Sequence, residues 1–165
     1  MNWDIKLHQF PSTLKGLIFS FILVMFFGYA ISLSFLNQTT GLNPQGVEEN
    51  YNGNEEDENA EIMKFKKSTF EMKTTIHNHL FSMAVILFIS GFILNFTSIN
   101  ITLKSFLMVE PLISLILTFG SILLMWNGLI WMKYIVILSG ILMHLSFLSS
   151  LCFSVRELFF VKTKH

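Results

Sequence analysis

The chain alternates four long apolar runs with polar connections, and each run is long enough to cross a membrane. The runs cover about residues 16–36, 80–96, 105–125 and 129–153 of the 165 residues. A helix needs about 20 mainly apolar residues to span the roughly 30 Å hydrocarbon layer of a bilayer. The pattern therefore predicts an all-α integral membrane protein. We expect four transmembrane helices in an antiparallel bundle, forming a single domain over residues 1–165.

The composition supports the same class. Hydrophobic residues make up 52% of the chain and charged residues 13%, with a mean hydropathy of +0.58. Lipid is the main solvent of such a chain. The sequence shows no phosphate-binding loop, no paired nucleophile and base, and no basic patch for nucleic acid. We expect the lipid bilayer and other membrane protein subunits as partners, no nucleic acid, and no enzyme activity of the chain by itself.

The positive charges predict the orientation of the helices. Cytoplasmic flanks of membrane proteins carry an excess of Lys and Arg, most clearly in short loops. If both termini lie inside, short inner flanks hold six of the eleven Lys and Arg residues, and four of the other five lie in one long loop. Both termini are therefore expected in the cytoplasm. The inner residues are Lys6, Lys15, Lys104, Arg156, Lys162 and Lys164.

The long outer loop, residues 37–75, carries eight of the eleven acidic residues and four lysines, which gives it a net charge of −4. Two interpretations stay open. The run NGNEEDENAE cannot bury apolar surface, which is typical of a solvated connection. Alternatively, the carboxylates form a docking surface, or a rim that collects cations beside the next helix.

His77 and His79 stand two residues apart where this loop runs into the second apolar run. Imidazole binds metals and haem iron, and it is costly to carry into hydrocarbon. On a helix, two positions this far apart point about 200° away from each other and cannot clasp one haem. On an extended segment they point to the same side and could chelate a metal, with Met83 as a soft third ligand. A packing role for both histidines is the alternative.

The cofactor expected at this pair is a b-type haem, a transition metal or a quinone, and an absence of any cofactor stays open. The chain has a single cysteine, Cys152, and no CxxCH motif, so a covalent c-type haem is excluded. His144 is expected about 20 Å deeper in the membrane, at 1.5 Å of helix rise per residue. It therefore cannot share an iron with His77 or His79.

Glu110 and His144 are costly residues inside the third and fourth runs. Both are predicted at a similar depth, and consecutive antiparallel helices are usually neighbours. A hydrogen bond between them is therefore expected. It would serve either as a clamp between two helices or as part of a proton relay or quinone site.

Three stretches carry a family resemblance: HNHLFSMAVILFISGFIL (77–94), EPLISLILTFGS (110–121) and ILSGILMHLSF (137–147). They resemble a family of uncharacterised bacterial four-helix inner-membrane proteins whose second helix opens with an HxHLFG motif. Some relatives carry a cytochrome c segment in the first outer loop, which implies a place in respiratory electron transfer. This chain departs from the pattern in its acidic loop, in Thr118 in place of an aspartate and in His144 in place of a glycine. The resemblance implies His77 and His79 as haem, metal or quinone-site groups.

Two functions follow as hypotheses. The first is a membrane subunit of a respiratory or other redox complex, with a haem b, metal or quinone at the outer edge of the second helix. The second is a non-catalytic structural or assembly subunit that docks onto a larger membrane complex without a cofactor. Both place the protein in a bacterial inner membrane.

Overall fold

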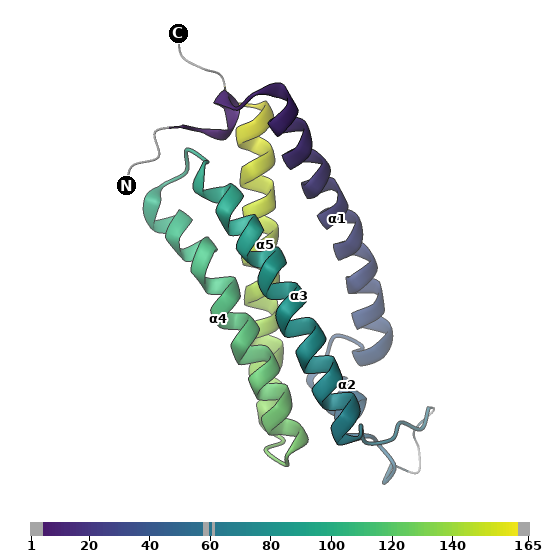
Figure 1. Cartoon of the computed structure of the whole chain (residues 1–165). Coiled ribbons are helices and arrows are strands. Elements are labelled where there is room, and N and C mark those ends of the chain that lie inside the picture. The colour runs from purple at the N-terminus through teal and green to yellow at the C-terminus, as the bar shows by residue number, and fades with distance from the viewer. Residues whose placement is uncertain (1–4, 58–59, 61, 162–165) are drawn as a thin grey trace.

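The computed structural model describes residues 5–57, 60 and 62–161. This part of the chain contains helices and no strands (Figure 1). Four helices are long and apolar enough to cross a membrane, which confirms the predicted all-α transmembrane class. A 3-10 helix η1 (Leu7–Gln9) and a short helix α2 (Pro44–Asn52) accompany them. The four long helices are α1 (Ser12–Thr40), α3 (Thr69–Asn95), α4 (Ile101–Trp126) and α5 (Met132–Phe159).

The helices extend beyond the apolar runs because polar residues cap them. The backbone N–H of Glu71 donates to the Ser68 hydroxyl (3.3 Å), and the Glu71 carboxylate accepts from the Ser68 backbone N–H (2.8 Å). This reciprocal capping box starts α3 at Thr69, well before the predicted start at residue 80. His77 and His79 therefore lie inside a helix, more than two turns from its beginning.

Helices α3, α4 and α5 form the packed core, and the pair α4 and α5 makes the most extensive contact. Small and polar residues bring these helices together. A Cβ atom added at Gly91 of α3 would lie 3.6 Å from Met108 Cα of α4. The hydroxyl oxygens of Thr118 and Ser139 lie 2.7 Å apart across the α4–α5 seam. Such close approaches are typical of membrane helix pairs.

Helix α1 lies at the side of this core (Figure 1). Only 11% of the residues in its most apolar window are buried, against 50% for α4. Ring contacts attach it to α5: Phe19 meets Phe159 (5.1 Å between ring centres) and Tyr29 meets His144 (5.5 Å). Helix α1 therefore packs on α5 and leaves most of its surface to the bilayer.

Helix α2 and the segment after it close one end of the bundle, here called the loop end. Val47 of α2 is buried, and the Asn52 amide donates to the Met125 carbonyl (3.2 Å). The Trp126 indole N–H donates to the Lys67 carbonyl (2.9 Å). The described part of the long loop is thus an ordered cap over these residues and not only a solvated connection. The opposite end, here called the terminal end, carries η1, the α3–α4 connection and the last turn of α5.

Candidate functional site

His77 and His79 lie near the loop end of α3, and both side chains are exposed. The backbone is helical through both residues, so the two rings point about 200° apart. The His77 ring lies against Phe81 (4.9 Å between ring centres), whereas the His79 ring lies beside Phe119 of α4 (5.6 Å). Of the two arrangements that the sequence left open, the structure has the helical one, in which the two histidines cannot chelate one metal. The capping box upstream is the physical reason.

His79 has the geometry of a single outward ligand. Its Nδ1 lies 2.9 Å from the Thr75 carbonyl oxygen. A carbonyl oxygen only accepts, so Nδ1 carries the hydrogen, and the lone pair of the neutral imidazole is on Nε2. A hydrogen bond of this kind fixes the tautomer and orientation of many metal-bound histidines.

Met83 follows His79 by one turn but packs against the apolar core. Within the part of the chain that the structure describes, no group of three His, Cys, Asp or Glu side chains is placed to hold a metal ion. A cofactor at His79 would therefore require ligands from elsewhere, such as a partner chain.

The predicted hydrogen bond between Glu110 and His144 is wrong. One carboxylate oxygen of Glu110 accepts from the Ser114 hydroxyl one turn along α4, and the other has no hydrogen-bond partner among the residues that the structure describes. His144 lies against Tyr29 of α1 instead. A difference in depth does not explain why this hydrogen bond is missing. Ser150 of α5 reaches the Leu107 carbonyl of α4 (3.5 Å), so the parts of the two helices that hold His144 and Glu110 lie at a similar level.

The error is rotational. Ser139 faces α4, and five residues later, at about 100° per residue, His144 is turned by roughly 140° from that direction. Its side chain therefore meets α1 and not Glu110. Neither the clamp nor the relay that the pair was predicted to form exists in this arrangement.

The sequence did not reveal a buried polar cluster at the terminal end. Glu157 of α5 is 3% exposed, and one of its carboxylate oxygens accepts from His8 Nδ1 (2.8 Å) and from the Ser98 hydroxyl (2.7 Å). The other oxygen accepts from the Ser98 backbone N–H (2.9 Å). The cluster ties the N-terminal segment and the α3–α4 connection to the end of α5. Its residues are up to 149 positions apart, and no short motif connects them.

A second buried charge stabilises the same end. The Lys104 ammonium donates to the carbonyls of Asn95 (3.0 Å) and Thr97 (2.6 Å), close to the last turn of α3. A cation at a helix C-terminus compensates its unpaired carbonyls and its dipole. Lys104 was predicted to be a flanking charge, and the structure shows that it also holds α3 and α4 together.

At the loop end, acidic side chains surround an open groove of about 650 Å³, here called the acidic groove. An ion pair holds helix α2, and with it the groove, against α5: the Lys133 ammonium of α5 lies 2.7 Å from the Glu48 carboxylate of α2. Trp126 and Ile130 add apolar surface to the same groove. The acidic residues that line it are Glu48, Glu49, Glu55, Glu56 and Asp57.

Comparison with known proteins identifies the family. Searches of curated proteins and of solved structures find no match. A family model described as a transmembrane helical domain matches residues 41–165, which include α2 to α5 and both His77 and His79. The chain belongs to this family of transmembrane helical domains.

Proposed function

We propose that the protein is a non-catalytic membrane subunit that docks onto a larger complex through its loop end. The observation that carries this proposal is the acidic groove, whose carboxylates lie on and just after the ordered helix α2. Five carboxylates and one lysine, Lys66, line the groove beside apolar surface. Glu48 and Glu49 are paired with Lys133 and Lys64. The remaining excess of negative charge suits a partner with a cationic segment, because complementary charge speeds and orients association. The Glu48–Lys133 ion pair and the Asn52–Met125 hydrogen bond hold the groove in place.

We place both termini in the cytoplasm of a bacterium, with the acidic groove on the outer face of the inner membrane. The support is the distribution of positive charge. At the terminal end the structure has Lys6 before η1, and Lys15, Lys104 and Arg156 in the end turns of α1, α4 and α5, as expected for a cytoplasmic side.

Removing charge from the groove tests the docking proposal. Changing Glu55 and Glu56 together to Gln should weaken association roughly 3- to 10-fold, because the two carboxylates no longer attract the partner's cations. The readout is native electrophoresis of membranes solubilised in a mild detergent, which separates the assembled from the free chain. Thr74→Lys also makes the net charge of this end less negative, but outside the groove, and should leave assembly unchanged. If the wild-type chain migrates alone in low salt, the proposal is wrong.

A second candidate function is that His79 binds a b-type haem or a transition metal whose other ligands come from the partner. The hydrogen bond from His79 Nδ1 to the Thr75 carbonyl favours it, because it leaves Nε2 as the ligating atom. The resemblance of the HNHLF stretch to the HxHLFG motif, and the cytochrome c segments of some relatives, add a redox setting for the complex.

His77 is a matched control for His79, since it lies two residues away and points to another side of α3. An optical spectrum and a metal analysis of the isolated complex provide the measurement. We expect a Soret band or bound metal that is lost in His79→Ala and retained in His77→Ala. A colourless and metal-free complex, or equal loss in both variants, would exclude the ligand role of His79.

A further inference from the structure

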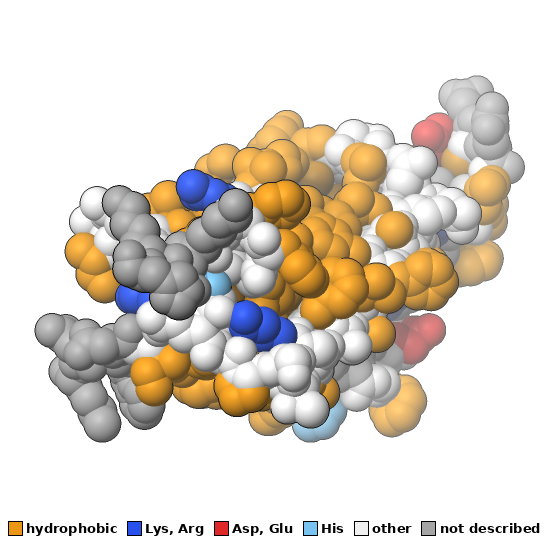
Figure 2. Space-filling view, turned by 90° about the horizontal axis from the view of Figure 1, so that it is seen from above, with side chains coloured by type: hydrophobic (Ala, Val, Ile, Leu, Met, Phe, Trp, Pro, Cys, Tyr) orange, Lys and Arg blue, Asp and Glu red, His pale blue; other side chains and the backbone are white. Residues whose placement is uncertain are grey.

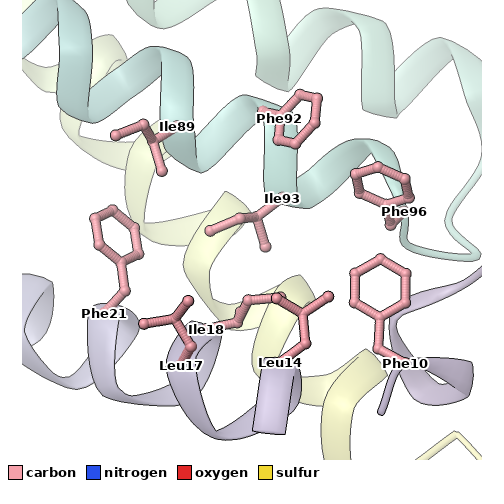
Figure 3. Close-up of a pocket in the computed structure, with 9 residues that line it drawn as sticks. All are labelled: Phe10, Leu14, Leu17, Ile18, Phe21, Ile89, Phe92, Ile93 and Phe96. Carbon is pink, nitrogen blue, oxygen red and sulfur yellow. The ribbon is translucent and has the colours of Figure 1, made fainter.

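An apolar groove runs between α1 and α3 near the terminal end (Figure 3). Leu14, Leu17 and Phe21 of α1 lie on one side, and Ile89 and Phe92 of α3 lie on the other. All side chains that line it are apolar. Leu17 and Phe92 are 66% and 55% exposed, so the groove opens sideways to the bilayer.

The groove follows from how the helices are attached. Phe19 and Tyr29 fix α1 to α5, and the close contact at Gly91 fixes α3 to α4. Neither set of contacts draws α1 against α3. At the terminal end, Phe10 and Phe96 close the groove with an edge-to-face ring contact (5.2 Å between ring centres).

The shape of the groove suits a lipid acyl chain. Its volume is about 460 Å³, and it opens sideways to the hydrocarbon layer. An acyl chain is narrow and can bend into it, whereas a helix about 10 Å across would lie mostly outside it.

Positive charge lies beyond the Phe10–Phe96 contact, and it favours a lipid with a negatively charged head group. Lys15 lies one residue after Leu14, and its ammonium donates to the His8 carbonyl (2.6 Å). An ammonium has three donors, so Lys15 can also bind a phosphate oxygen. Lys6 caps η1 at the same end, and separate Lys and Arg side chains are visible on this end of the molecule (Figure 2). The Glu157 carboxylate at this end is buried and faces His8 and Ser98.

We infer that the groove between α1 and α3 binds one acyl chain of an anionic phospholipid, whose phosphate lies at Lys15 and Lys6. Apolar side chains hold the acyl chain inside the hydrocarbon layer. The two lysines attract a negatively charged head group at the interface, where each basic residue favours anionic lipid about fivefold. This site is separate from the acidic groove, because it lies at the opposite end of the bundle.

Native mass spectrometry of the purified full chain tests this inference. The protein is incubated in detergent with phosphatidylglycerol or with phosphatidylcholine, and the lipid adducts that survive detergent release are measured. We expect one retained phosphatidylglycerol and much less phosphatidylcholine.

Leu17→Trp fills the groove and should lose the adduct, whereas Ile116→Trp, on the exposed surface of α4, should keep it. Lys15→Gln and Lys6→Gln should each weaken phosphatidylglycerol binding about fivefold, and Lys73→Gln at the loop end should not.

Several results would overturn the inference. Equal retention of both lipids contradicts the lysine site. An unchanged adduct in Leu17→Trp contradicts the groove as its location. A protein that copurifies in equal amount and is displaced by Leu17→Trp shows that a polypeptide fills the groove. Circular dichroism of every variant confirms that loss of lipid is not loss of the helical fold.

Discussion

Replacing Glu157 by alanine is expected to lower the melting temperature in detergent by roughly 5–10 °C, which corresponds to about 2–3 kcal/mol for a chain of this size. The Glu157 carboxylate accepts three hydrogen bonds, two from Ser98 and one from His8. Without it, the half-buried His8 ring and the Ser98 backbone N–H lose their acceptor, and the buried place of the Glu157 side chain is left empty. Leaving a partly buried donor unpaired costs more than the net value of the bond itself.

The neighbouring exposed residue provides the control. Arg156→Ala should change the free energy of unfolding by at most about 0.5 kcal/mol, as most surface substitutions do. His8→Ala should cost clearly less in the Glu157→Ala background than in the wild type, because the two residues share one interaction. Equal melting temperatures for the Glu157 and Arg156 variants would show that the cluster does not hold the terminal end together.

Replacing Gly46 by alanine is expected to detach the cap at the loop end. A Cβ atom at this position would lie 1.9 Å from the Thr40 carbonyl oxygen, at the end of α1. That distance is far shorter than a van der Waals contact, and the backbone atoms of both helices are fixed by their own hydrogen bonds. Helix α2 must therefore move away from α1, at a cost of about 1–3 kcal/mol for overpacking. The movement would also weaken the Glu48–Lys133 ion pair and distort the acidic groove.

Limited proteolysis measures this effect locally. Trypsin can cut after Lys64, Lys66 and Lys67 when the cap opens, so cleavage should become roughly 5- to 100-fold faster in Gly46→Ala. Gly120→Ala is the matched control, because nothing lies within 4 Å of its added Cβ. It should leave the cleavage rate unchanged and stabilise α4 slightly, since Ala is the better helix former. Equal cleavage of both variants would contradict the tight contact at Gly46.

The transmembrane helices could be predicted because each rests on local information. Apolar runs of membrane length specify a helix by themselves, since an unpaired backbone is excluded from hydrocarbon. The ends of the helices were less accurate. Helix α3 starts at Thr69 because Ser68 and Glu71 cap it, although residues 69–79 mix polar side chains with Phe70, Met72 and Ile76 and form no continuous apolar run.

Contacts between helices could not be predicted, because they depend on rotation as well as depth. Glu110 and His144 illustrate this: an antiparallel neighbour places them at a similar level, but His144 faces Tyr29 of α1. The pair His8 and Glu157 shows the converse, since residues at opposite ends of the sequence form a buried contact that no local pattern indicates. The sequence showed which polar residues lie in costly, apolar surroundings. The partner of each one depends on how the helices pack, which the sequence did not show.

The fold also changes the interpretation of the two histidines. The sequence left open whether they act together on one metal. The helical backbone of α3 separates them and leaves His79, with its Nδ1 hydrogen bond, as the better placed ligand. The proposed ligand role of His79 is tested separately from docking at the acidic groove, by the spectrum of the His79→Ala variant.

Photo-cross-linking in intact membranes tests docking at the loop end most directly. A photoreactive amino acid is placed at Gln45, an exposed residue that lines the acidic groove, and in a second strain at Thr74, which is exposed at the same end outside the groove. We predict one defined adduct with another membrane protein from position 45, none from position 74, and less adduct when Glu55 and Glu56 are changed to Gln. No adduct from position 45, or the same adducts from both positions, would contradict the proposal that the acidic groove receives a partner.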